Sequence, residues 1–250
     1  MGKIIVEKLT KQEYKRIMAN AIHVGGESII CRTPFPNEVY KFFTYGENLD
    51  SENAYPNKRK KLETLYEMPN LMYMSKPISI VETEDIFTGY KMTYDEQDIS
   101  LATAILTPQE TYLHLKKLKF ILEYLKTRGI VHGDVQSKNI LVNPVLKTTK
   151  VCDIDNSKIG PFQIDVMEEE MLYYTDTRGK VDSTADMYMY NLLTLQQLSY
   201  RDATYAEILN LIEKGIYPQN FRKEANQVLE SMLNPRTYDG KTIIEYAKRK

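Results

Sequence analysis

An aspartate and an asparagine with the spacing needed for phosphoryl-transfer chemistry lie in the segment 130–142. Asp134 and Asn139 are five residues apart, after His132 and directly before an apolar stretch that predicts a strand. In phosphoryl transfer a carboxylate orients the attacking hydroxyl and takes its proton, while a nearby amide oxygen can bind the Mg²⁺ on the phosphates. The two side chains fit these two tasks.

A second acidic segment follows at 151–156. Asp153 comes fourteen residues after Asn139, which is a length that a β-hairpin can use to return the chain to its starting point. A hairpin here would bring the Asp153 carboxylate close to the Asn139 amide. Oxygen ligands of these two kinds suit Mg²⁺. The spacing therefore predicts a metal site at the open end of a hairpin.

The first part of the chain is rich in predicted strands. Thr10 and Glu13 form a capping-box pattern that opens a helix ending near Ala21. A further helix is predicted at about residues 59–68. Strand patterns fall at residues 28–31, 38–43, 78–81 and 86–92.

The second part is predicted to be mostly helical. Thr107, Pro108 and Glu110 combine an N-cap, a proline at the first helical position and a capping glutamate. An apolar face with helical spacing follows, and Gly129 ends the helix. Later helices are predicted at residues 183–198, 203–213, 220–233 and 241–249.

Composition narrows the class of protein. The 250 residues are 42% hydrophobic and 27% charged, as in ordinary globular proteins. The net charge of -1 does not favour nucleic acid or an anionic membrane as a partner. The two cysteines, Cys31 and Cys152, are too few for a disulfide framework and fit a reducing compartment. Without a signal-peptide pattern or an apolar span, we expect a cytoplasmic protein.

The segments around Asp134 and Asp153 resemble the catalytic loop and the metal-binding loop of the protein kinase superfamily. This resemblance implies an α+β, two-lobed protein-kinase-like fold. Residues 1–93 would form a β-rich N-lobe, and residues 94–250 a mainly helical C-lobe, within one kinase domain. The hinge would lie near Met92, which we count among the nucleotide-binding residues.

In the C-lobe, the resemblance implies a role for each polar residue of the two loops. Asp134 would be the catalytic base, and Lys138 would neutralise charge on the γ-phosphate in the transition state. Asn139 and Asp153 would hold Mg²⁺. Asp155, where the kinase motif has glycine, is an alternative metal ligand if the register shifts by two residues.

In the N-lobe, the segment 23–28 resembles a reduced form of the kinase nucleotide-covering loop. Gly25, Gly26 and Ser28 would bring backbone N–H groups close to the phosphates of ATP. Read without the resemblance, the segment is an ordinary turn.

The strand predicted at 38–43 carries one lysine between apolar residues. Lys41 resembles the kinase lysine that contacts the α- and β-phosphates. That lysine pairs with a glutamate on the following helix. Glu63 has the better spacing for this pair, and Glu67 is the second candidate.

Several positions depart from the kinase pattern. Gly133 replaces the arginine that reads a phosphate on the activation segment, so activity would not need such phosphorylation. The segment 171–179 lacks the Ala-Pro-Glu signature, which leaves the substrate-docking surface open. Downstream, Asp186 resembles the helix aspartate that tethers the catalytic loop.

The resemblance implies a small bacterial- or phage-type Ser/Thr protein kinase that uses ATP and Mg²⁺. Its partner would be a protein substrate, with the chain itself included, and neither nucleic acid nor a membrane. Two alternatives stay open. The His-Gly-Asp sequence at 132–134 resembles that of aminoglycoside or choline phosphotransferases, which act on small molecules, more than that of most eukaryotic kinases. The reduced glycine loop and Asp155 are also compatible with an ATP-binding pseudokinase that acts as a scaffold.

Overall fold

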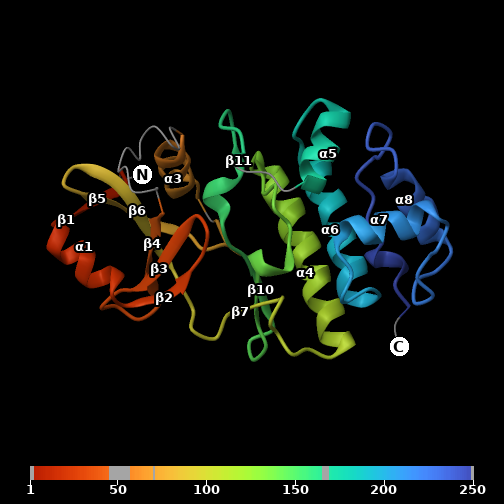
Figure 1. Ribbon diagram of the computed structural model, residues 1–250, viewed down its shortest axis with the longest axis horizontal. Helices are drawn as coiled ribbons and strands as arrows, with labels where there is room; N and C mark the ends of the chain where they lie inside the picture. Colours follow the sequence, from red (N-terminus) through yellow and green to blue (C-terminus); the bar gives the residue numbers. More distant parts are fainter. Residues whose placement is uncertain (1–2, 45–56, 70, 165–168, 249–250) are drawn as a thin grey trace. The chain divides into compact units, whose positions relative to one another are not determined.

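The computed structural model describes residues 3–44, 57–69, 71–164 and 169–248. The chain divides into two compact units, Met1–Asp98 and Ile99–Lys250 (Figure 1). The first unit contains a six-stranded mixed sheet with helices, and the second contains helices with two small sheets, so the protein is of the α+β class. Within the described segments, every helix is too short or too polar to cross a membrane.

The sheet of the first unit has the strand order β1-β5-β6-β4-β3-β2. Its edge strand β1 runs parallel to β5, and all other pairs are antiparallel. The strands are β1 (Ile5–Leu9), β2 (Ala21–Val24), β3 (Ser28–Arg32), β4 (Glu38–Phe43), β5 (Pro77–Thr83) and β6 (Ile86–Thr93).

The four inner strands confirm the sequence prediction, whereas the two edge strands were not predicted. Every residue of β2 is exposed, and β1 buries none of its side chains fully. Strands with so little burial lack the alternation of apolar and polar residues that reveals a strand in a sequence. The first helix, α1 (Lys11–Met18), has the predicted capping box but ends earlier than expected, because Ala21 already belongs to β2.

Two apolar layers cover the two faces of this sheet. On one face, Leu62 of α3 (Lys58–Glu67) packs with Val39, Phe43 and Tyr90. On the other face, side chains of α1 pack against a cluster built around Phe42. The central strands β4 and β6 approach so closely at Gly89 that a Cβ atom there would clash with the β4 backbone. Glycine at position 89 therefore allows β4 and β6 to pair in the middle of the sheet.

The second unit is built around two long helices, α4 and α6, which pack against each other. A capping box at Thr107 opens α4, as predicted. The helix α5 was not predicted from the sequence. The helices are α4 (Pro108–Thr127), α5 (Glu169–Arg178), α6 (Ser183–Leu198), α7 (Tyr205–Glu213) and α8 (Glu224–Met232). The small sheets comprise β10 (Thr148–Val151), β9 (Ile140–Asn143) and β7 (Ile99–Ser100), and β11 (Lys158–Ile159) with β8 (Ile130–Val131).

The prediction of a helix at residues 241–249 was wrong. Among the described residues of this segment, 241–248, the helical structure is a single 3-10 turn, Ile244–Tyr246. The backbone makes tertiary hydrogen bonds instead: the N–H of Ile243 donates to Asn191 Oδ1 over 3.0 Å, and the N–H of Arg222 donates to the carbonyl of Tyr246 over 2.9 Å. These long-range bonds replace the helical ones and override local propensity.

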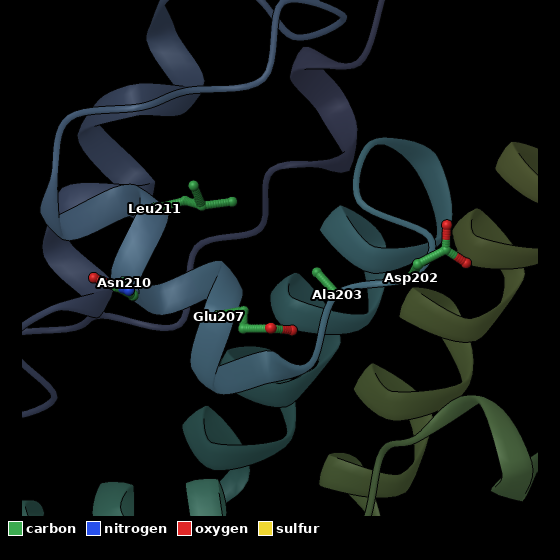
Figure 2. Close-up of a pocket in the computed structure, with 5 residues that line it drawn as sticks. All are labelled: Asp202, Ala203, Glu207, Asn210 and Leu211. Carbon is green, nitrogen blue, oxygen red and sulfur yellow. The ribbon is translucent and has the colours of Figure 1, made fainter.

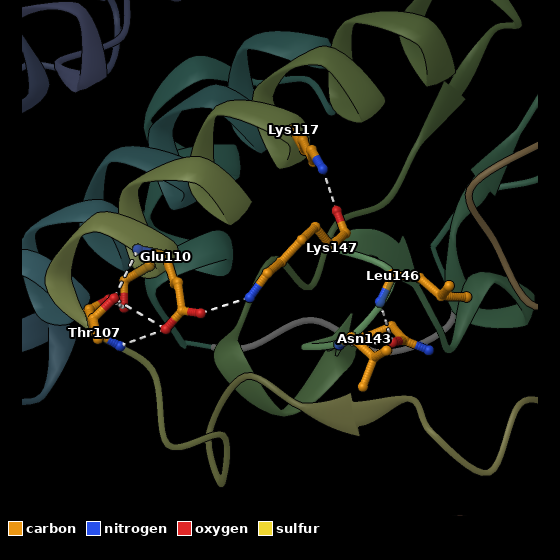
Figure 3. Close-up of polar contacts among 8 residues, drawn as sticks. Thr107, Glu110, Lys117, Asn143, Leu146 and Lys147 are labelled. Carbon is orange, nitrogen blue, oxygen red and sulfur yellow. Dashed lines mark hydrogen bonds and ion pairs between the residues drawn. The ribbon is translucent and has the colours of Figure 1, made fainter.

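The turn between β9 and β10 is fixed to helix α4 (Figure 3). Lys147 Nζ lies 2.6 Å from Glu110 Oε1, and Lys117 Nζ donates to the carbonyl oxygen of Lys147. Asn143 Oδ1 accepts bonds from two backbone N–H groups of the turn, at 3.1 and 2.9 Å. One end of the hairpin is thus held rigidly, and its other end carries Asn139 and Asp153.

Candidate functional site

The segment that follows β8 is anchored by a buried carboxylate from α6. Asp186 is 1% exposed. Its Oδ2 accepts the backbone N–H of His132, and its Oδ1 accepts that of Gly133, both over 2.8 Å. Burial raises the pKa of Asp186, while these two N–H donors oppose the rise. The predicted tether is therefore confirmed: Asp186 fixes the start of the 132–139 loop.

His132 joins this loop to the segment that carries Asp153. Its Nδ1 accepts the N–H of Asp134 over 3.2 Å, and its Nε2 lies 2.8 Å from the carbonyl oxygen of Cys152. Because Nδ1 accepts a hydrogen bond, Nε2 must carry the proton and donate to Cys152. The imidazole thereby holds two distant parts of the chain together.

Asp134 and Asn139 are bonded to each other. Asn139 Nδ2 donates to Asp134 Oδ2 over 2.6 Å and to the Asp134 backbone oxygen over 3.2 Å. Asn139 is only 3% exposed, whereas Asp134 is half-buried. The amide nitrogen therefore orients the Asp134 carboxylate, and the Asn139 amide oxygen is the atom suited to a cation.

The β9–β10 hairpin brings Asp153 beside Asn139. Ile140 pairs with Val151 in the antiparallel register, and the N–H of Cys152 donates to the carbonyl of Asn139 over 3.0 Å. The hairpin predicted from the spacing is confirmed. Asp153, the next residue, has a φ of 57°, a left-handed conformation that is uncommon outside glycine. Such conformations often cluster at functional sites.

The residue types at this place are those that can bind magnesium. Across the described ranges, no three His, Cys, Asp or Glu side chains converge as a complete metal cage. Mg²⁺ is usually bound by one or two carboxylates, with water and substrate phosphates completing its shell. The Asn139 amide oxygen and the Asp153 carboxylate match that need. Asp155, the alternative ligand, is fully buried two residues further on.

The backbone around Lys138 is held by a serine of β7. Ser100 Oγ lies 3.0 Å from the carbonyl of Ser137 and 3.3 Å from that of Lys138. The Lys138 side chain itself is exposed. The loop backbone is thus fixed at this end.

Gly133 has a structural reason to be glycine. Its φ is 80°, and a Cβ atom there would clash with Cδ1 of Ile164. Ile164 is buried, so its side chain fills the space over the loop at this position. The sequence contained no signal for this contact, because the two residues are thirty-one positions apart.

In the first unit, the predicted glycine loop is the connection between β2 and β3. The N–H of Gly25 donates to the carbonyl of Ser28 over 2.9 Å, which makes the connection short. A Cβ atom at Gly26 would meet nothing within 4 Å. The loop backbone at Gly26 is therefore open to an approaching group.

Lys41 and Met92 lie on the same face of this sheet. Lys41 is 3% exposed, and its Nζ lies 5.9 Å from the centre of the Tyr90 ring. Lys41 pairs with Tyr90 in the register, and Val39 pairs with Met92. Met92 belongs to the apolar layer under α3.

Glu63 has a partner on its own helix. Its Oε1 lies 3.2 Å from Nε of Arg59, one turn earlier, and Arg59 also bonds Glu82 over 2.7 Å. Glu63 was predicted to pair with Lys41. The bond that the structure gives Glu63 is the one to Arg59.

A surface depression on α7 contains none of the predicted site residues (Figure 2). It is lined by Asp202, Ala203, Glu207, Asn210 and Leu211. Glu207 Oε2 accepts the N–H of Thr204 over 2.7 Å, in the capping box of α7. The Glu207 carboxylate therefore caps the N-terminus of α7.

Comparison with protein-family models and with curated protein sequences gave no match.

Proposed function

We propose that this chain is an ATP-dependent phosphotransferase with a protein-kinase-like fold, and that it transfers the γ-phosphate to Ser/Thr hydroxyls of a protein substrate. The observation that carries the proposal is the arrangement of three oxygen-bearing side chains in the second unit. Asp134 accepts a hydrogen bond from Asn139, and the hairpin holds Asp153 next to Asn139. Protein kinases use a catalytic base and two metal-binding side chains for this reaction.

In this proposal Asp134 accepts the proton of the attacking hydroxyl. Its Oδ2 is oriented by Asn139 Nδ2, so the carboxylate needs little rearrangement when substrate binds. Asn139 and Asp153 hold Mg²⁺, which would neutralise charge on the phosphates. The exposed Lys138 is long enough to place an ammonium group on the transferred phosphate.

The first unit supports the proposal through the order of its elements. A glycine-containing loop joins β2 to β3, Lys41 lies on the next strand, and a helix with Glu63 follows. The same order of loop, lysine strand and glutamate helix is used by protein kinases for ATP phosphates. Lys41 is the residue of this unit that we assign to the phosphates.

The packing at Gly133 supports activity without a phosphate on the activation segment. Where kinases of the regulated type have an arginine, this chain has a glycine covered by Ile164. The loop start is ordered by Asp186 and by this apolar contact.

Binding of nucleotide tests the metal assignment directly. We would measure the affinity for ATP by calorimetry, with and without Mg²⁺, for the wild type, Asn139→Ala and Asp153→Asn. Each variant should bind Mg·ATP at least about tenfold more weakly, equivalent to about 1.4 kcal/mol. Asp239→Asn is the control, because it removes a surface carboxylate that pairs with Lys241. Unchanged Mg·ATP affinity in both site variants would refute the assignment.

A second measurement separates the acceptor classes. Wild-type protein with labelled ATP would be offered a basic protein, no added substrate, and small hydroxyl compounds. Label on protein supports the kinase. Label on small molecules alone would move the function to a small-molecule phosphotransferase. ATP binding without any transfer would make the chain a pseudokinase.

A further inference from the structure

We infer that Tyr205 is a positioning residue for Asp134, and that its hydroxyl acts through the carbonyl oxygen of Val135. The inference rests on the proposed function and deepens it. Tyr205 lies on α7, seventy residues after Val135, and nothing in its sequence surroundings connects it with the loop.

The contact is a buried hydrogen bond. Tyr205 is 7% exposed and Val135 is 0% exposed. The Tyr205 hydroxyl donates to the carbonyl oxygen of Val135 over 3.2 Å. This carbonyl belongs to the peptide unit between Val135 and Gln136, so the bond fixes the second peptide plane after the proposed base.

The bond complements the other anchors of the loop. Asp186 holds the N–H groups of His132 and Gly133, and Ser100 holds the carbonyls of Ser137 and Lys138. These anchors fix the two ends of the segment 132–138. Tyr205 bonds the middle of the segment, at the residue that directly follows Asp134.

The start of α7 is rigid enough for this role. Thr204 caps the helix: its Oγ1 accepts the N–H of Glu207 over 3.2 Å, and Glu207 Oε2 accepts the N–H of Thr204 over 2.7 Å. Tyr205 is the first residue of the helix, directly after this cap. A capping box fixes the backbone from which the phenol extends.

Without the hydroxyl, the Val135 carbonyl loses its bond and the peptide plane gains freedom to rotate. Small displacements of a catalytic group cost rate, because the attacking hydroxyl and the base must be aligned. We expect Tyr205→Phe to lower kcat about 10- to 100-fold. The KM for ATP should change less than about twofold, since the bond does not touch the nucleotide-binding residues.

Tyr190→Phe is a matched control. The Tyr190 hydroxyl also donates to a backbone carbonyl, that of Leu115, over 3.0 Å in a buried setting. Both variants remove one buried hydroxyl from one carbonyl, so both should lower the urea midpoint of unfolding to a similar extent. Only Tyr205→Phe should lower kcat while leaving the KM for ATP unchanged.

The experiment is steady-state transfer of γ-phosphate by the full chain, for the wild type and both variants. A kcat loss confined to Tyr205→Phe supports the inference. An active wild type with equal kcat in the two variants overturns the inference and leaves the proposed function intact. A wild type that transfers no phosphate overturns the proposed function, and the inference with it.

Discussion

Removing the Asp186 carboxylate tests how the 132–139 loop is held. Asp186→Ala leaves the N–H groups of His132 and Gly133 buried without their acceptor, and both bonds are 2.8 Å long. An unsatisfied buried donor costs about 1–3 kcal/mol, so the pair costs about 2–6 kcal/mol. The variant also relieves the burial of a carboxylate whose pKa is raised by that burial. We therefore expect the lower part of the range, about 2–4 kcal/mol.

The assay is urea unfolding, with the free energy of unfolding taken from the midpoint at an unchanged slope. Asp182→Ala is the control, because Asp182 caps the same helix by accepting the N–H of Thr184 over 2.9 Å. Loss of such a cap costs about 1 kcal/mol. If Asp186→Ala destabilises the protein no more than Asp182→Ala, the tether does not hold the loop as argued.

Two further changes follow from single contacts. Gly133→Ala should cost about 2–4 kcal/mol of unfolding free energy, from its positive φ and the clash with Ile164. In a double-mutant cycle with Ile164→Ala, the two costs should fall short of additivity by at least about 1 kcal/mol, and additive costs would exclude the clash. The pKa of Glu110 is lowered to about 2, chiefly by Lys147 and Thr107. Its contribution to stability is therefore present above about pH 4.3 and lost as the pH falls toward 2, so Glu110→Gln and the wild type should converge in that window. A constant difference between pH 5 and pH 2 would contradict this pairing.

The parts of the fold that were predicted correctly depend on local signals. Thr107 and Glu110 are three residues apart, and their capping box is present. Asn139 and Asp153 lie at the open end of the same hairpin, which is short and regular, so its length can be predicted from the sequence. The same is true of the four inner strands of the sheet, whose buried residues alternate or form apolar runs.

The parts that were missed depend on contacts between distant residues. The segment after Lys241 has helical composition, but the N–H of Ile243 donates to Asn191 instead of taking part in a helix. Ile164 over Gly133 and Tyr205 against Val135 join segments that are far apart in the chain. Periodicity and spacing do not indicate contacts between distant residues, so these contacts around the candidate base could be identified only from the structure.

Transfer of the γ-phosphate of ATP in the presence of Mg²⁺, compared between the wild type and Asp134→Asn, tests the central claim most directly. The account predicts label on a Ser or Thr hydroxyl with the wild type. In the variant the rate should fall by about 10²–10⁴-fold, the range for loss of a general base, while ATP remains bound. Equal transfer by Asp134→Asn would contradict the role of Asp134, and bound ATP without transfer by the wild type would contradict the claim of a phosphotransferase.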